Sequence, residues 1–112
     1  MSTVPTLPGI TSKMIDTPRL KMHVLFSGPE NGTPVLFVHG NASSASYWEE
    51  VMLKLPAGFR GIAPDLRGHG QTVNPGGEFT FRQVALDTFA LLDHLGIDRV
   101  KAIGMSLGAN TL

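Results

Sequence analysis

The chain has no cysteine among its 112 residues. It therefore cannot form a disulfide, hold a metal ion through thiolates or use a cysteine as a nucleophile. It also has no net charge, because nine lysine and arginine residues are balanced by nine aspartate and glutamate residues. A chain without a field of one sign has little to attract nucleic acid or an anionic membrane surface, and we expect neither as a partner.

Long apolar runs are missing as well. The longest are four residues, as at 35–38, far short of a transmembrane helix. No basic residue precedes Lys13 and no apolar stretch of a secretory signal is present. Hydrophobic residues nevertheless make up 42% of the chain and charged residues only 16%, a composition typical of a chain with a buried core. We therefore expect a soluble, cytoplasmic, globular protein.

Short apolar segments alternate with amphipathic ones along the chain. Residues 1–10 contain two prolines and a glycine without a regular period, and we interpret them as an extended lead-in to a domain over 11–112. The pattern predicts an α/β domain with a mostly parallel sheet and flanking helices. Strands are expected at 13–16, 20–26, 34–38, 59–63 and 99–103.

Capping signals predict two helices. The first begins near Ser46, which has the capping-box spacing to Glu49, and it ends before Pro56. Its expected apolar stripe is Trp48, Val51, Met52 and Leu55.

The second helix follows Thr80, which has the same capping-box spacing to Gln83, and Gly96 stands where it should end. Phe79 is placed to contact Val84 as a hydrophobic staple. The expected apolar face is Phe81, Val84, Ala85, Thr88, Leu91, Leu92 and Leu95.

Glycine-rich clusters follow the last three predicted strands. They are H-G-N at 39–41, D-L-R-G-H-G at 65–70 and G-M-S-L-G at 104–108. Because ligands bind beyond the carboxyl ends of parallel strands, we expect these clusters to lie together at one edge of the sheet.

The third cluster has the G-x-S-x-G pattern of a nucleophile elbow between a strand and a helix. The turn would lift the Ser106 hydroxyl out of the strand, and the following helix would direct its free N–H groups at the site. Ser106 could then attack a carbonyl carbon while the Leu107 N–H donates to the oxyanion. The Asn41 N–H, in a loop that Gly40 allows to turn tightly, is the candidate second donor.

These three clusters resemble the N-terminal half of the α/β-hydrolase superfamily, over about residues 11–112. The resemblance implies that Ser106 is the nucleophile, that the backbone N–H groups of Asn41 and Leu107 form the oxyanion hole, and that no cofactor is used. Residues 39–48 look most like the haloalkane dehalogenase and luciferase-like branch. That branch, however, has an aspartate at the nucleophile position and usually a tryptophan after it.

Serine at the elbow resembles instead the esterase, lactonase and carbon–carbon bond hydrolase branches. These branches attack the carbonyl of a small-molecule substrate through an acyl-enzyme. Other chemistry on the same fold remains open, including acyl transfer, perhydrolysis and cofactor-free lyase reactions. A small-molecule-binding module with little or no turnover also remains open.

One part of the family pattern is absent. In the family the catalytic acid and histidine follow the nucleophile, yet the six residues after Ser106 include no Asp, Glu or His. We therefore expect an N-terminal portion of a hydrolase, truncated after the elbow and inert as a fragment unless a complementary C-terminal segment or chain is its partner. The strand at 99–103 would then be an exposed apolar edge that promotes association.

Several polar residues near the clusters have alternative interpretations. His39 could be a general base, although the resemblance favours a structural role. Asp65 and Arg67 are expected to shape their loop and not to act as an acid–base pair. Trp48 could contact a substrate pocket or pack in the core.

The other histidines are expected to be structural. His69 lies in a glycine-rich loop and is expected at the surface. His94 suits the last turn of its helix, where a positive charge is favourable, and His23 is expected to be packed or at a sheet edge. Because the four histidines are scattered, we expect no metal site.

Overall fold

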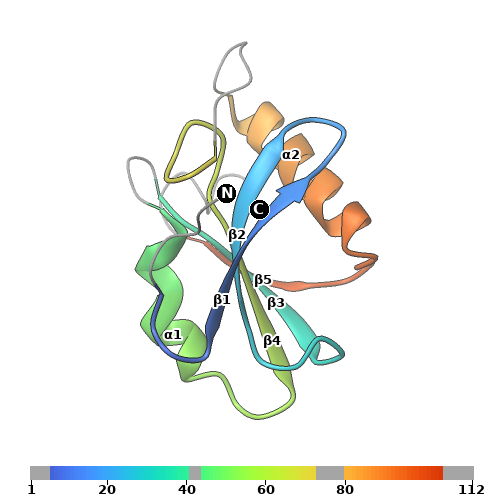
Figure 1. Cartoon of the computed structure of the whole chain (residues 1–112). Helices are drawn as coiled ribbons and strands as arrows, with labels where there is room; N and C mark the ends of the chain where they lie inside the picture. The colour runs from blue at the N-terminus through green and yellow to red at the C-terminus, as the bar shows by residue number, and fades with distance from the viewer. Residues whose placement is uncertain (1–5, 41–43, 73–79, 105–112) are drawn as a thin grey trace.

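The computed structural model describes residues 6–40, 44–72 and 80–104 (Figure 1). Its strands are β1 (Ile10–Asp16), β2 (Lys21–Ser27), β3 (Thr33–Val38), β4 (Phe59–Pro64) and β5 (Lys101–Gly104). The 3₁₀-helix η1 (Ala45–Trp48) and helix α1 (Glu49–Leu53) lie between β3 and β4, and α2 (Phe81–His94) lies between β4 and β5. All five predicted strands and both predicted helical regions are therefore present, although β1 begins three residues earlier than expected.

The strands form one mixed sheet in the order β1-β2-β4-β3-β5. β2 pairs antiparallel with both β1 and β4, whereas β3 pairs parallel with both β4 and β5. The parallel strands β4, β3 and β5 are the three that run into the glycine-rich clusters. The predicted α/β architecture is confirmed, and the carboxyl ends of these three strands lie at the same edge of the sheet.

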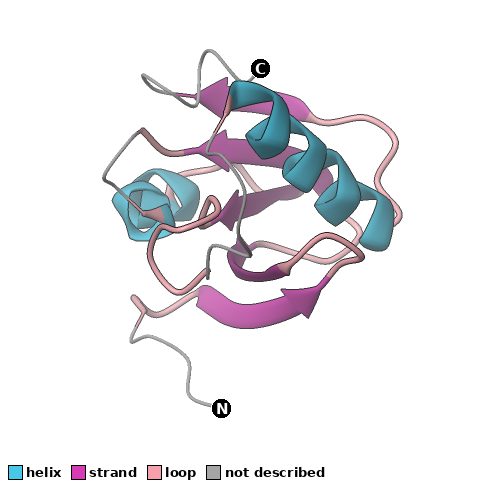
Figure 2. Cartoon of the chain, turned by 90° about the horizontal axis from the view of Figure 1, so that it is seen from above, coloured by secondary structure: helices cyan, strands magenta, loops and turns pink. Residues whose placement is uncertain are grey.

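Helices lie on both sides of the sheet (Figure 2), and alternate strand residues pack towards opposite sides. On one face, Leu25, Phe37 and Ala63 pack with Trp48 and Met52 of the short helical region. On the other face, the strands pack against α2 through the cluster Met22, Val24, Leu36, Val38, Ile62, Val84 and Leu91. The apolar run in β3 is buried on both faces because α2 packs on one face of the sheet and the short helical region packs on the other.

The prediction for the first helix was wrong in detail. Ser46 lies inside η1, and the N-cap of η1 is Ser44, whose side chain makes no capping hydrogen bond. Of the predicted stripe, Trp48 and Met52 are buried, but Val51 is 43% exposed. The reason is that a 3₁₀ turn has three residues per turn and α1 has only five residues, so no single 3.6-residue period runs through the segment.

The predicted limits of α2 are confirmed, but the predicted capping box is formed only in part. The Thr80 hydroxyl accepts a hydrogen bond from the Gln83 N–H at 3.1 Å, whereas the Gln83 side chain accepts from Arg19 and does not complete a capping box. At the other end Gly96 has φ +72°, and the N–H groups of Gly96 and Ile97 donate to carbonyls of the last turn in a Schellman arrangement. Phe79, the predicted staple, is outside the described residues.

Helix α2 has 14 residues. Within the described part of the chain, no helix combines the length and the apolar character needed to cross a membrane.

Candidate active site

The three predicted site residues, Ser106, Asn41 and Leu107, lie outside the described residues. The structure does describe where the chain enters the segments that carry them. In the parallel pairing of β3 with β5, Val38 is opposite Gly104. Val38 directly precedes the H-G-N cluster, and Gly104 is the first glycine of the G-x-S-x-G cluster. The two clusters therefore begin side by side.

His39 is fully buried at the end of β3 and uses both ring nitrogens. Its Nε2 accepts a hydrogen bond from the Leu66 N–H at 3.0 Å, so the ring proton is on Nδ1, which is 2.7 Å from the Gly40 carbonyl oxygen. Burial lowers the pKa of His39, although the hydrogen bond to Gly40 opposes this effect. A neutral ring with both nitrogens engaged supports the structural role and leaves no nitrogen free to act as a base.

Asp65, directly after β4, is 2% exposed and accepts three hydrogen bonds. Its Oδ1 accepts from the Ala45 N–H at 2.7 Å, and its Oδ2 accepts from the Gln71 N–H at 2.9 Å and from His23 at 2.7 Å. Burial by itself would raise the pKa of Asp65, but the hydrogen bonds, with that from His23 the strongest, hold the pKa below its ordinary value. Gly70 is required beside this carboxylate, because a Cβ there would lie 2.2 Å from Oδ2.

His23 connects Asp65 to the first two strands. It is 1% exposed in β2, and its Nε2 is 2.5 Å from the Ser12 hydroxyl of β1. Its backbone N–H donates to the Thr72 hydroxyl at 2.9 Å. The expected packed position of His23 is confirmed, but its bond to Asp65, 42 residues away, was not predicted. The available signal was a histidine inside an otherwise apolar strand.

Arg67 forms a buried ion pair with Asp87 of α2. Its Nε and Nη2 donate to the two carboxylate oxygens of Asp87 at 2.6 and 2.9 Å, and Arg19 Nε adds a third bond at 2.8 Å. The hydrogen bonds to Asp87 raise the pKa of Arg67. The predicted loop-shaping role of Asp65 and Arg67 is confirmed, with His23 as partner of the first residue and Asp87 as partner of the second.

Trp48, His69 and His94 also have predicted positions. Trp48 packs in the core, with its ring 5.2 Å from that of Phe37. His69 is half-buried, so the prediction of a surface histidine was wrong in part: its ring packs 5.1 Å from that of the buried His39. His94 is exposed in the last turn of α2, as predicted.

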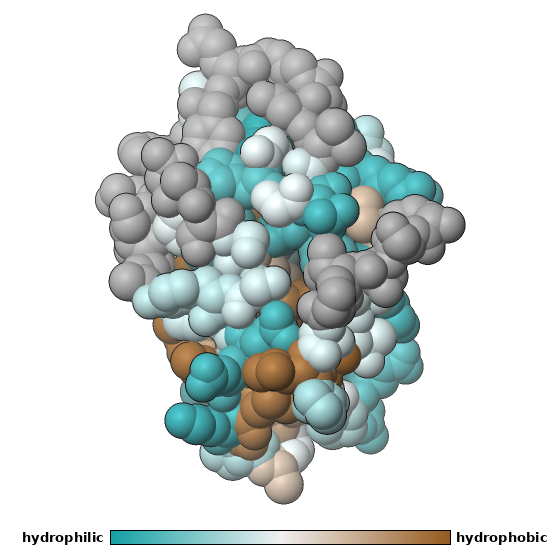
Figure 3. Space-filling view, turned by 60° about the vertical axis from the view of Figure 1, so that its left-hand side comes forward, coloured by the Kyte–Doolittle hydropathy of each residue, from teal (hydrophilic) through white to brown (hydrophobic). Residues whose placement is uncertain are grey.

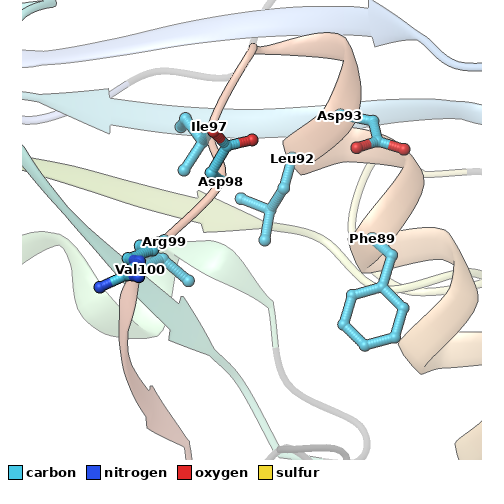
Figure 4. Close-up of a pocket in the computed structure, with 7 residues that line it drawn as sticks. All are labelled: Phe89, Leu92, Asp93, Ile97, Asp98, Arg99 and Val100. Carbon is cyan, nitrogen blue, oxygen red and sulfur yellow. The ribbon is translucent and has the colours of Figure 1, made fainter.

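A groove of about 610 Å³ lies between the second half of α2 and the connection to β5 (Figure 4). Phe89 and Leu92 line it from the helix, and Ile97 and Val100 line it from the connection. These connecting residues precede β5, so the groove lies at the amino end of that strand, opposite to the three clusters. The rule that ligands bind at carboxyl ends therefore favours the clusters over this groove as the functional site.

Comparison with known proteins identifies the family. A family model described as alpha/beta hydrolase fold matches residues 33–112, and the chain belongs to this family. The chain is 41% identical over 98 residues to Epoxide hydrolase 2 of Siraitia grosvenorii, covering 85% of this chain and 30% of the relative. It is 30% identical over 105 residues to Haloalkane dehalogenase 2 of Mycobacterium bovis, covering 93% of this chain and 36% of that protein.

Solved structures give the same result. The epoxide hydrolase of Vigna radiata superposes with a TM-score of 0.86 at 33% identity, over 96% of this chain and 33% of that one. A putative acyltransferase from Salmonella enterica superposes with a TM-score of 0.87 at 28% identity, over 96% of this chain and 37% of that one. The chain thus spans about a third of the length of the proteins that it matches. The predicted likeness of residues 39–48 to the dehalogenase branch agrees with these matches.

Proposed function

We propose that this chain supplies the nucleophile and the oxyanion-binding groups of a serine hydrolase that acts on an ester, a lactone or a similar carbonyl compound. Ser106 attacks the carbonyl carbon, and the N–H groups of Asn41 and Leu107 stabilise the negative charge on the oxygen. The leaving group departs with a proton, and water then hydrolyses the acyl-enzyme.

One observation carries this proposal: the pairing of Val38 with Gly104. It brings together the beginnings of the segment with Asn41 and the segment with Ser106. A serine hydrolase needs an oxyanion donor from each of two such segments. The family match and the buried, neutral His39 beside Gly40 support the same arrangement.

The serine favours carbonyl substrates over the epoxides and haloalkanes named in the relatives. A carboxylate that attacks an alkyl carbon forms an ester, which water can hydrolyse. A serine that attacked the same carbon would form an alkyl ether, which water does not cleave under these conditions. Only attack on an acyl carbon gives Ser106 an intermediate that turns over.

The general base comes from outside this set of residues. His39 has both nitrogens engaged, and no histidine follows Ser106 in the sequence. The matched relatives are about three times as long as this chain, which leaves room for an acid and a histidine. We therefore propose a complementary C-terminal segment or chain as the partner that completes the site.

Hydrolysis of an activated short-chain ester by the complete enzyme tests this function, with Ser106→Ala as the variant. We expect the variant to lose at least about 10³-fold in kcat while its circular dichroism spectrum is unchanged. An epoxide and a haloalkane serve as alternative substrates in the same assay. Ester turnover that survives in the variant, or turnover of the epoxide in place of the ester, would contradict the proposal.

Acyl transfer is the second candidate, because the putative acyltransferase from Salmonella enterica superposes closely. The same acyl-enzyme would then pass its acyl group to an alcohol or amine instead of water. Adding an alcohol acceptor to the ester assay distinguishes the two functions. A transferase gives mainly the new ester, whereas a hydrolase gives mainly the free acid.

A further inference from the structure

The segment at residues 40–45 is held at both ends by the chain that follows β4. At the first end, His39 accepts a hydrogen bond from the Leu66 N–H and contacts the Gly40 carbonyl. At the other end, the Ala45 N–H donates to Asp65 Oδ1 at 2.7 Å. Asn41, the candidate oxyanion donor, lies between these two anchors in the sequence.

The Asp65 carboxylate is itself held on several sides. His23 and the Gln71 N–H donate to Oδ2, and the absence of a side chain at Gly70 leaves the space that the carboxylate occupies. His23 is further held through Ser12 and Thr72. Because the Asp65 carboxylate is fixed in this way, the hydrogen bond from the Ala45 N–H also fixes the position of Ala45.

We infer that Asp65 is a positioning residue for the reaction: it fixes the Ala45 N–H, four residues after Asn41 in the sequence, and so supports the oxyanion donor that the proposed function assigns to Asn41. This inference depends on the proposed function. Asp65 contacts no reacting atom, and it acts through the backbone of the loop. His23 has the subordinate role of orienting the Asp65 carboxylate.

The physical reason is that an oxyanion donor is effective only when it is fixed before the reaction begins. Loss of one such donor lowers kcat by roughly 10²- to 10³-fold. A donor that remains present but is poorly held should cost less. We therefore expect a decrease in kcat of about 10- to 100-fold when Asp65 is altered, with little change in KM.

Asp65→Asn is the sharpest variant because it preserves shape and removes one acceptor. An amide has one oxygen and one NH2 group, whereas both carboxylate oxygens now accept. If the amide oxygen faces His23 and Gln71, the NH2 group faces the Ala45 N–H and that bond is lost. If the amide is turned around, the NH2 group faces two donors and the side chain is displaced.

Asp87→Asn is the matched control. Asp87 is also a buried carboxylate with several donors, but its partners are Arg19 and Arg67, and no hydrogen bond or ion pair joins it to residues 44 and 45 in the described structure. Thr80→Ala is a milder control that removes the side-chain N-cap of α2. All variants are assayed below their melting temperatures.

Two measurements decide the outcome. We expect Asp65→Asn to lower kcat and to accelerate amide hydrogen exchange in peptides that span 40–48. Thr80→Ala should change neither, and Asp87→Asn, which acts on the same loop only through Arg67, should change both less than Asp65→Asn does. If Asp65→Asn matches the controls in kcat and in exchange, the inference is overturned. If Ser106→Ala retains turnover, the proposed function fails, and the exchange result then decides by itself whether Asp65 holds this segment.

Discussion

Two regions of the molecule differ in how completely their side chains are buried and paired. At the carboxyl end of β4, Asp65 and Asp87 are almost fully buried, and each carboxylate accepts at least three hydrogen bonds. At the β5 edge, by contrast, Ile103 is 43% exposed and Phe89 of the neighbouring helix is 61% exposed. Within the described residues, β5 pairs only with β3.

The carboxyl end of β4 is therefore closely packed and fully hydrogen-bonded, whereas the β5 edge is exposed. The β4 end carries buried charge, which is unfavourable unless every group is paired, so its geometry has few alternatives. Among the described residues, no strand pairs with the other side of β5, so an exposed apolar side chain and backbone groups of this edge can bind another strand or segment. Some apolar surface is also visible in the lower half of the view in Figure 3. On α1, Val51 and Leu53 are exposed.

The largest loss of stability is expected from breaking the ion pair between Arg67 and Asp87. Asp87→Ala leaves the buried guanidinium of Arg67 without its bidentate partner. Removing one member of a buried pair typically costs about 3–5 kcal/mol, so the variant should be strongly destabilised. Urea unfolding measures this change. A loss below 1 kcal/mol would mean that the pair is not the organising contact between the 65–72 loop and α2.

Gly70→Ala should have the next largest effect. Its φ is +52° and the added Cβ would lie 2.2 Å from Asp65 Oδ2. Backbone strain and displacement of the carboxylate together should cost about 1–3 kcal/mol. Gly58→Ala is the matched control, because Gly58 has φ +89° but nothing within 4 Å of the added Cβ. Equal losses in the two variants would contradict a specific role for the space beside Asp65.

The buried His39 predicts a pH dependence. Because burial lowers the pKa of His39 below its ordinary value of 6.5, the unfolded chain takes up the proton first as the pH falls. The stability contributed by neutral His39 is therefore present above pH 6.5, decreases as the pH falls below it, and stops decreasing below the folded-state pKa. The lowered pKa of Asp65 acts in a separate range, below about pH 4.

Urea midpoints between pH 8 and pH 5 test this dependence. The His39→Gln variant lacks the titrating ring, so the difference in stability between the parent and the variant should shrink towards pH 5. A difference that stays constant over this range would show that His39 does not titrate with folding.

The smallest change in stability is expected at the β5 edge. Ile103→Lys alters an exposed side chain and should shift the unfolding free energy by no more than about 0.5 kcal/mol. It should nevertheless reduce self-association of the isolated chain, because a charge on an edge strand opposes pairing. Val51→Lys is the control, since Val51 is equally exposed but lies on α1. Sedimentation velocity would contradict this account if both variants, or neither, reduced association.

Sequence periodicity predicted the elements well where one local signal was sufficient. The apolar run at 34–38 identified an interior strand, and the spacing of Thr80 and Gln83 identified the start of α2. The short helical region after Ser44 was less predictable, because a 3₁₀ turn and a five-residue helix do not share one period.

The polar network was not predictable in the same way. His23 and Asp65 are 42 residues apart, and Arg67 and Asp87 are 20 apart, so no local pattern links the members of either pair. Their pairing follows from the antiparallel register of β2 with β4 and from the packing of α2 on the sheet. Glycines at 68 and 70 indicated a tightly turned loop, but not which carboxylate occupies the space beside Gly70.

Covalent labelling of the complete enzyme with a fluorophosphonate tests the central claim most directly, because the reagent forms a stable adduct with an activated serine. The account predicts one adduct, located by peptide mass spectrometry on Ser106, and its loss in Ser106→Ala. It also predicts slower labelling in Asp65→Asn than in Asp87→Asn. An unlabelled Ser106 in a folded protein that hydrolyses esters, or an adduct that persists in Ser106→Ala, would contradict it.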